Sequence, residues 1–312
     1  MDMMRRVLVC SCQKIVKDEE QDMRNSPRTR LGAALGAAVL TASALFGGTA
    51  HGATATVRHS PAAQAVVHGT VVRDDLQALF RKAGVRGTFA LLDVKRGQTT
   101  VVDAARAKQR MIPASTFKIP HSLIALETGA VKDENEVIPY GGQPQQFPEW
   151  EHDMNLRDAI AASNVPVFQT LARRIGLKRE NQWVNRLSYG NRRIGPVVDR
   201  FWLDGPLEIS AVEQTRFLSR LARQQLPASK KNQLKVREML KIEEKDGYAL
   251  FAKTGWGMST TPSLGWWVGW VERGDRLHTF ALNIDMDGAQ DTGKRIPLTR
   301  DLLTALGVLP KA

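Results

Sequence analysis

The pattern of apolar and polar residues divides the chain into a strand-forming start, a helical middle and a strand-forming end. Residues 87–94 and 98–102 are predicted to form a β-hairpin around Lys95-Arg96-Gly97. From about residue 113 to 223 the apolar residues recur with a helical period, interrupted by loops. From residue 248 onward the period is two, which indicates strands again.

The same pattern predicts the individual elements. Further strands are expected at 248–254, 264–272 and 277–286, and the last two are joined across Arg273-Gly274-Asp275. Residues 139–148 are rich in Gly, Pro and Gln and are expected to form a loop. Helices are expected at residues 75–83, 116–128, 156–162, 166–175, 180–187, 211–223, 230–242 and 297–306.

Strands at both ends with helices between them indicate an α/β (α+β) fold. We expect an antiparallel β-sheet flanked by helices, with an inserted all-helical subdomain. The sheet part would comprise about residues 70–109 and 229–312, and the helical part about residues 110–228. Together they would form a single catalytic domain over residues 53–312, with a ligand cleft between the two parts.

Residues 1–52 are predicted to be an export signal region. Three arginines between residues 24 and 30 precede residues 31–46, a run without charge that small residues follow at the expected cleavage sites, after residue 52 or 55. The run is short for a membrane span, so we expect no stable membrane anchor, with an uncleaved anchor as the alternative. The predicted location of the mature chain is the periplasm.

Two details of this region affect the mature chain. Met23 stands where a signal peptide would begin, so translation is expected to start there, with residues 1–22 not translated and the signal at about 23–52. The chain has two cysteines, Cys10 and Cys12, both ahead of the signal. The exported chain would therefore have neither a disulfide framework nor a thiol nucleophile nor a thiolate metal site.

The net charge and the spacing of the histidines bear on whether the chain binds nucleic acid or a metal ion. The chain has 44 Lys and Arg against 32 Asp and Glu, a net charge of +12, but the basic residues are scattered without an RNA-binding signature. We therefore expect no nucleic-acid partner; a basic surface also suits anionic small substrates. The six histidines show no metal-binding spacing, so no metal site is expected.

The most informative motif is Ser115-Thr116-Phe117-Lys118, which follows Pro113 and opens an apolar helical run. Residues i and i+3 share a helical face, so the lysine amine would lie within reach of the serine hydroxyl. A serine needs an adjacent base to act as a nucleophile, and burial lets lysine be that base because it disfavours the ammonium form. The alternative is an ordinary helix start with a capping serine and a solvated lysine.

Three further motifs follow in order: Ser163-Asn164-Val165, Tyr189-Gly190-Asn191 and Lys253-Thr254-Gly255. With Ser115 and Lys118, this set resembles the serine β-lactamases and penicillin-binding proteins, in which SxxK and KTG motifs recur. Val165 at the third position of the second motif, the YGN motif and residues 201–207 make the chain similar to class D, or oxacillinase-type, β-lactamases. The resemblance covers roughly residues 70–312.

The resemblance implies roles for the residues of the SxxK motif and its surroundings. Ser115 would be the acylated nucleophile, and Lys118 would be carbamylated by carbon dioxide (N6-carboxylysine) and act as general base. Val165 would form an apolar wall around the amine. The indole N–H of Trp202 would hold a carbamate oxygen; a plain core aromatic is the alternative for this residue.

The remaining roles also rest on the resemblance. Ser163 would bridge Lys118 and Lys253 and relay a proton to the leaving nitrogen. The alternative for Ser163 is an ordinary polar residue at a helix end, and the alternative for Lys253 is a solvated lysine at a strand end. The substrate would be bound by Thr254, Gly255, Trp256, Lys294 and Arg295. The alignment with the family motif does not decide whether Lys294 or Arg295 binds the substrate carboxylate. A lysine there would lose the bidentate geometry that an arginine offers.

The predicted function is hydrolysis of β-lactam antibiotics, which confers resistance, with no cofactor beyond carbon dioxide or bicarbonate. A β-lactam sensor domain that acylates without turnover is the main alternative, and a peptidoglycan transpeptidase or carboxypeptidase is the other. His121 and His152 are expected to be structural histidines. The preferred β-lactam and the oligomeric state do not follow from the sequence.

Overall fold

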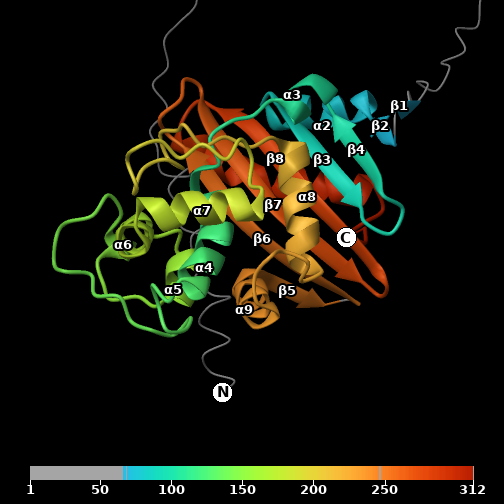
Figure 1. Cartoon of the computed structure of the whole chain (residues 1–312). Coiled ribbons are helices and arrows are strands. Elements are labelled where there is room, and N and C mark those ends of the chain that lie inside the picture. The colour runs from blue at the N-terminus through green and yellow to red at the C-terminus, as the bar shows by residue number, and fades with distance from the viewer. Residues whose placement is uncertain (1–65, 68, 246, 312) are drawn as a thin grey trace, which may run out of the picture. The chain divides into compact units, whose positions relative to one another are not determined.

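An eight-stranded sheet runs through the part of the chain that the computed structural model describes, residues 66–311 without 68 and 246 (Figure 1). The predicted export signal and the two cysteines lie outside the described residues. All neighbouring strands are antiparallel except β2 and β4, which are parallel. In spatial order the strands are β1 (Val66–Val67), β2 (Thr70–Val72), β4 (Gln98–Val102), β3 (Gly87–Asp93), β8 (Arg276–Met286), β7 (Ser263–Arg273), β6 (Tyr248–Gly257) and β5 (Lys241–Lys245).

The central strands are buried on both faces because helices cover the sheet from both sides. In β7, Trp266 and Trp270 pack into the cluster shared with the helical part, whereas Trp267 and Val271 pack into the cluster on the opposite face. This alternation follows from the two-residue period of a strand. The aromatic residues of β7 therefore hold two layers of helices to one sheet.

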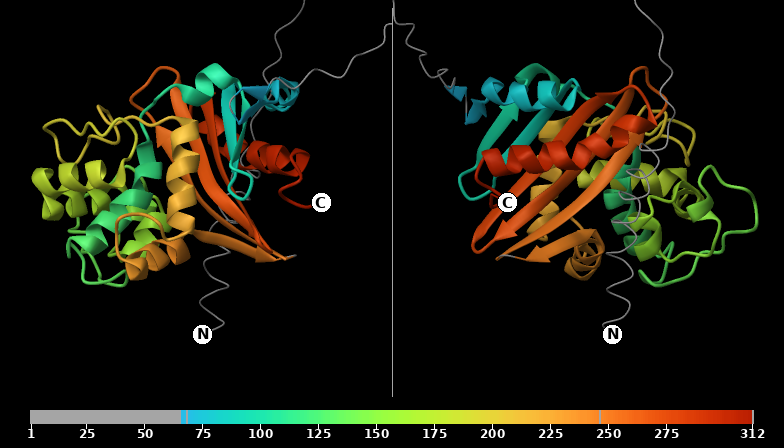
Figure 2. Two further views of the ribbon diagram at one scale, coloured as in Figure 1. Left: turned by 45° about the vertical axis from the view of Figure 1, so that its right-hand side comes forward. Right: turned by 180° about the vertical axis from the view of Figure 1, so that it is seen from behind.

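Helix α8 (Ala211–Ala222) packs on one face of the sheet, across β8, β3 and β7. Helices α2 (Gln77–Ala83) and α10 (Arg295–Ala305) pack against each other on the opposite face, as Figure 2 shows from behind. Helix α3 (Ala104–Lys108) follows β4 and contacts α8 and β3. The sheet is thus the middle layer, and α8 lies between the sheet and the helical part described next.

The remaining helices form the helical part beside the sheet (Figure 1). They are α4 (Lys118–Glu127), α5 (Leu156–Ala161), α6 (Val165–Ile175), α7 (Leu177–Leu187) and α9 (Lys230–Leu240). Four 3-10 turns complete the described elements: η1 (Asp74–Leu76), η2 (Ala114–Phe117), η3 (Pro148–Trp150) and η4 (Ala289–Lys294). No helix among the described residues has the length and apolar character that crossing a bilayer requires.

The α+β class, the hairpin, the three C-terminal strands and the main helices are confirmed. One helix was predicted to run into a strand: the helix expected at 230–242 ends at Leu240, and residues 241–245 form β5. Pairing with β6 overrides the helical pattern there, and the charged side chains of β5 suit an edge strand. The helix expected at 180–187 begins earlier, at Leu177, and the strand expected at 248–254 extends to Gly257. Strands β1 and β2 and helix α3 were not predicted. The limits of the sheet and helical parts, about residues 110 and 228, stay predictions.

Candidate active site

The Ser115 hydroxyl and the Lys118 amine are in direct contact. Lys118 Nζ donates a hydrogen bond of 2.9 Å to Ser115 Oγ. Ser115 lies in the 3-10 turn η2 and Lys118 is the first residue of α4, so the two side chains share one face a single turn apart. Lys118 is completely buried and Ser115 is 8% exposed. The alternative of a solvated lysine at an ordinary helix start is therefore excluded.

Several contacts fix the turn that carries Ser115. Ala114 has a φ of +48°, a conformation that costs a non-glycine residue energy, and its N–H donates to Trp202 O over 3.0 Å. Thr116 Oγ1 donates to Pro113 O over 2.7 Å. Trp266 of β7 donates its indole N–H to Ile112 O over 2.9 Å. The turn of the predicted nucleophile Ser115, the nucleophile turn, is thus held to the sheet and to the 201–207 segment.

The environment of Lys118 favours its neutral amine. Burial, and secondarily the positive charge of Lys253, lower the pKa of Lys118 well below its ordinary value. The ring of Phe168 lies 5.2 Å from Lys118 Nζ and forms part of the apolar surroundings. A neutral amine has a lone pair, so it can accept a proton or react with an electrophile.

A second serine–lysine pair joins the helical part to the sheet. Lys253 Nζ of β6 donates a 2.6 Å hydrogen bond to Ser163 Oγ, between α5 and α6. Ser163 has a φ of +57°, and the next residue, Asn164, caps α6 through Val167 N. Lys253 is 6% exposed. Two hydroxyls and two amines thus belong to one electrostatically coupled site.

The edge of β6 beyond β5 faces the nucleophile turn. Among the described residues, β5 pairs with β6 only up to Phe251, and η2 contacts β6 past that point. A side chain at Gly255 would place its Cβ 3.0 Å from Thr116 Cγ2. Glycine therefore permits the close approach of the two segments. Trp256 pairs with Gly265 of β7 and lies half-buried on this edge.

Trp202 lies in the aromatic cluster next to the nucleophile turn. Its ring stacks on Phe117 with a centroid distance of 5.7 Å. Its indole N–H is buried and has no acceptor within the described part of the chain. An unsatisfied buried donor is costly, which distinguishes Trp202 from a plain core aromatic. Val165 is half-buried at the start of α6.

The two candidates for carboxylate recognition are placed differently. Arg295 donates through Nη1 to Gly255 O over 2.9 Å and through Nε to Thr292 O over 2.8 Å. Lys294 instead pairs with Asp291 over 2.7 Å, near Gly84 at the end of α2. Of the two side chains, the arginine reaches the KTG strand.

Comparisons with known proteins agree with this geometry. The family model of the penicillin-binding protein transpeptidase domain matches residues 87–304. The chain is 43% identical to β-lactamase OXA-5 of Pseudomonas aeruginosa over 233 residues, which are 74% of this chain and 87% of the relative. It is 40% identical to β-lactamase OXA-48 of Klebsiella pneumoniae over 75% of this chain and 88% of that protein.

Solved structures point the same way. The class D β-lactamase YbXI from Nostoc superposes with a TM-score of 0.74 at 40% identity, covering 76% of this chain and all of that one. FUS-1 (OXA-85), a class D β-lactamase from Fusobacterium nucleatum, superposes with a TM-score of 0.74 at 38% identity, covering 76% of this chain and 99% of that one. The chain belongs to the class D β-lactamases.

Three buried residues of this class D enzyme were given no role from the sequence. Gln214 of α8 is buried and donates to Thr116 Oγ1 over 2.8 Å and to Tyr189 OH over 3.2 Å. It thereby ties the YGN segment to the nucleophile turn. The sequence does contain a signal for Gln214, because this polar residue stands among the apolar residues on the buried face of an amphipathic helix. Phe168 and Glu180, both buried, are the others.

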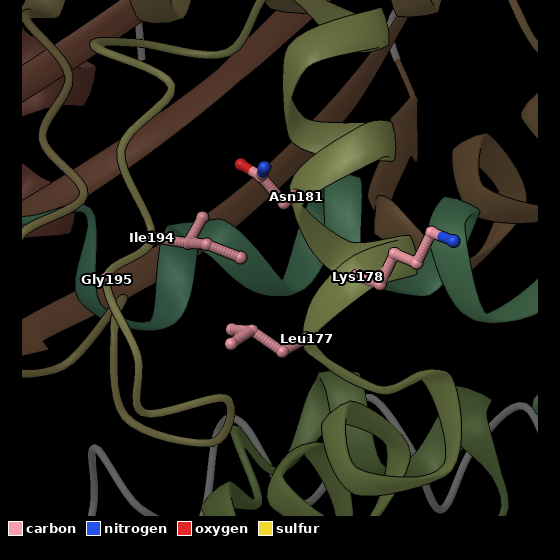
Figure 3. A pocket seen from close by; sticks show the side chains of 5 residues that line it. All are labelled: Leu177, Lys178, Asn181, Ile194 and Gly195. Atoms are coloured by element: carbon pink, nitrogen blue, oxygen red, sulfur yellow. The ribbon is translucent and has the colours of Figure 1, made fainter.

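Away from the candidate catalytic residues, a surface pocket of about 520 Å³ lies between α7 and residues 194–195 of the class D enzyme (Figure 3). None of the predicted site residues lines it. Within the described ranges no group of three or more His, Cys, Asp or Glu side chains could hold a metal ion. The lining residues are Leu177, Lys178, Asn181, Ile194 and Gly195.

Proposed function

We propose that this β-lactamase hydrolyses β-lactam antibiotics through an acyl-enzyme on Ser115, with carbamylated Lys118 as the general base. The observation that carries the proposal is the contact of 2.9 Å between a fully buried lysine amine and the serine hydroxyl. A lysine amine in an apolar pocket at this distance can take the hydroxyl proton, which a solvated ammonium cannot. The 40–43% identical relatives named above are β-lactamases and support the reaction class.

In the acylation step Ser115 Oγ attacks the β-lactam carbonyl carbon and forms the ester bond. Its proton passes to the base at position 118, and the C–N bond of the four-membered ring breaks. The ring nitrogen takes up a proton through Ser163, whose hydroxyl lies 2.6 Å from Lys253 Nζ. The backbone N–H groups of Ser115 and Trp256 would stabilise the negative charge on the carbonyl oxygen.

The surroundings of Lys118 fit a carbamate. The neutral amine attacks the carbon of carbon dioxide, an N–C bond forms, and the amine loses a proton to solvent. The buried indole N–H of Trp202, which has no acceptor among the described residues, would donate to a carbamate oxygen. The carbamate supplies an anionic base, which would also serve to activate the water that hydrolyses the ester.

Two cations would recognise the substrate carboxylate. Arg295 lies at Gly255 on the edge of β6, and Lys253 lies two residues before it. A guanidinium offers two parallel N–H donors to a carboxylate, whereas the Lys253 amine contributes a point charge. Thr254 and Gly255 would line the same edge.

The place of action is proposed to be the periplasm. The support is the uncharged run of residues 31–46 between the arginines and the small residues around 52. Destruction of β-lactams in that compartment would protect the cell-wall enzymes and confer resistance. Peptides from residues 1–22 in an export-blocked precursor would contradict a start at Met23.

The deciding experiment is turnover of a chromogenic cephalosporin and a penicillin by the chain from about residue 53, with and without bicarbonate. Many turnovers per enzyme that bicarbonate increases support the proposal, and Lys118→Ala should abolish them. A single stoichiometric burst with a stable adduct on Ser115 would instead indicate a sensor or a transpeptidase-like protein. If the turnover rate in degassed buffer is the same with and without bicarbonate, the carbamate hypothesis is rejected, while hydrolysis through Ser115 is retained.

A further inference from the structure

A histidine and a glutamate meet inside the helical part. His121 of α4 and Glu180 of α7 both have side chains with no exposed surface. His121 Nε2 lies 2.7 Å from Glu180 Oε1. The reaction proposed for Ser115 and Lys118 uses neither residue.

This pair is costly in its surroundings. Although Nε2 and Oε1 lie close to each other, both nitrogens of His121 and both oxygens of Glu180 are buried without a hydrogen bond to any described residue. Buried polar groups of this kind cost stability, and apolar residues of similar size often replace such pairs at no loss. The pair therefore calls for an explanation other than stability.

The position of His121 supplies that explanation. It follows Lys118 by one helical turn, and both residues are buried on α4. The His121 ring lies 5.1 Å from the ring of Trp202 and 5.5 Å from that of Phe168. Phe168 in turn lies 5.2 Å from Lys118 Nζ. One imidazole thus contacts two rings of the lysine pocket.

The direction of the Trp202 indole depends on such packing. Because its N–H has no acceptor among the described residues, hydrogen bonding does not orient the ring. Its ring neighbours are Phe117, His121 and Phe201. Of these three, His121 is the one whose own ring is tied to a second helix, through Glu180.

We propose that His121 and Glu180 are a positioning pair that sets the Trp202 and Phe168 rings around Lys118 for carbamate formation. The proposal rests on the proposed carbamylation of Lys118 and adds two residues that do not touch the substrate. The polar contact between α4 and α7 would fix the imidazole. The imidazole would then hold the indole N–H in the direction that a carbamate oxygen needs.

The test compares two substitutions of similar size at position 180. Glu180→Gln retains a polar contact to His121, and Glu180→Met removes it. Each variant is titrated with ¹³C-labelled bicarbonate, and the carbamate carbon resonance and the hydrolysis rate are followed together. We expect Glu180→Gln to match the wild type within about twofold. Glu180→Met should need about tenfold more bicarbonate for half-maximal signal, as for misplaced reacting groups.

A double variant separates positioning from stability. His121→Leu with Glu180→Leu removes both polar side chains and should unfold at a denaturant concentration equal to or above that of the wild type. We expect its bicarbonate requirement to rise about tenfold nonetheless. Lys178→Ala, at an exposed lysine of α7 that lines the surface pocket in Figure 3, is the control and should leave both values unchanged.

The outcomes are distinct. A stable Glu180→Met or double variant with the bicarbonate requirement of the wild type would overturn the positioning role and leave the carbamate intact. The absence of a carbamate resonance from the wild type would overturn carbamylation of Lys118, and this proposal with it. If the double variant does not fold, the comparison of Glu180→Gln with Glu180→Met decides alone.

Discussion

Lys253 and Ser163 stand 90 residues apart in the sequence, and their Nζ and Oγ atoms lie 2.6 Å apart. The contact joins strand β6 to the corner between α5 and α6. Ser163 holds a φ of +57°, which costs a residue with a side chain about 1–2 kcal/mol. The corner thus accepts a strained backbone at the residue whose hydroxyl meets the lysine.

Replacing Ser163 tests whether the hydroxyl or the backbone matters. Ser163→Ala and Ser163→Gly both remove the hydroxyl, so both should lower kcat by about 10²–10⁴-fold, the usual range for a lost proton-transfer group. Glycine accepts the positive φ without strain, so the free energy of unfolding of Ser163→Gly should exceed that of Ser163→Ala by about 1 kcal/mol. Steady-state kinetics and urea unfolding measure the two effects. A Ser163→Gly variant with wild-type kcat would contradict the relay role.

The buried amine of Lys118 should reduce stability at neutral pH. Its pKa is lowered in the folded chain, by burial first and by Lys253 second. Between the lowered pKa and the ordinary lysine value, the unfolded chain binds a proton that the folded chain does not. The contribution of Lys118 to the free energy of unfolding therefore rises with pH across that window.

Lys118→Met should remove this dependence. In degassed, bicarbonate-free buffer at pH 7, the variant should unfold with a free energy about 0.5–2 kcal/mol higher than the wild type, the usual range for stabilising substitutions, and should be inactive. The difference should shrink as the pH rises. Lys178→Met, at an exposed lysine of α7, is the control and should change stability by less than about 0.5 kcal/mol. Equal pH profiles for wild type and Lys118→Met would argue against the lowered pKa.

The sequence predicted local relationships better than distant ones. The contact of Ser115 with Lys118 follows from helical spacing, because residues three apart share a face. The contact of Ser163 with Lys253 depends on how α5 and α6 pack beside β6, and no local pattern encodes that. It could be expected only from the family resemblance.

The helices and strands that the sequence failed to predict are short or mostly polar. Helix α3 has five residues, too few to show a period, and β5 is a charged edge strand whose pairing partner alone makes it a strand. His121 and Glu180 gave a weak signal, a polar residue within an apolar helical run and a glutamate on a mostly polar helix. Their meeting depends on the packing of α4 against α7.

The YGN motif lies close to residue 208, and Gly190 provides a test of this close approach. The residue has a φ of +53°, and a Cβ there would lie 2.0 Å from Glu208 O. Gly190→Ala must displace backbone, so we expect the free energy of unfolding to fall by more than about 3 kcal/mol. Gly129 has a φ of +67°, but a Cβ there would meet open space within 4 Å, so Gly129→Ala should cost only about 1–2 kcal/mol. Equal losses from urea unfolding would contradict the close approach.

Arg295 and Lys294 are neighbours in the sequence but face different partners. Arg295 donates to Gly255 O on the KTG strand, and Lys294 pairs with the buried carboxylate of Asp291. If Arg295 binds the substrate carboxylate, Arg295→Ala should lower kcat/KM by about 10–100-fold, because charge-assisted hydrogen bonds contribute about 1.5–3 kcal/mol. Arg295→Lys should fall between the wild type and Arg295→Ala, because it retains the charge and loses the planar fork.

The comparison of a penicillin with its methyl ester isolates the carboxylate. Arg295→Ala should lose activity toward the acid and much less toward the ester, which has no carboxylate to bind. Lys294→Ala should stay within about threefold of the wild type for both substrates, because the Lys294 amine pairs with Asp291 instead of reaching the KTG strand. Thermal unfolding of each variant checks that Arg295→Ala has not loosened the β6 edge. A larger loss for Lys294→Ala than for Arg295→Ala would assign carboxylate binding to the lysine instead.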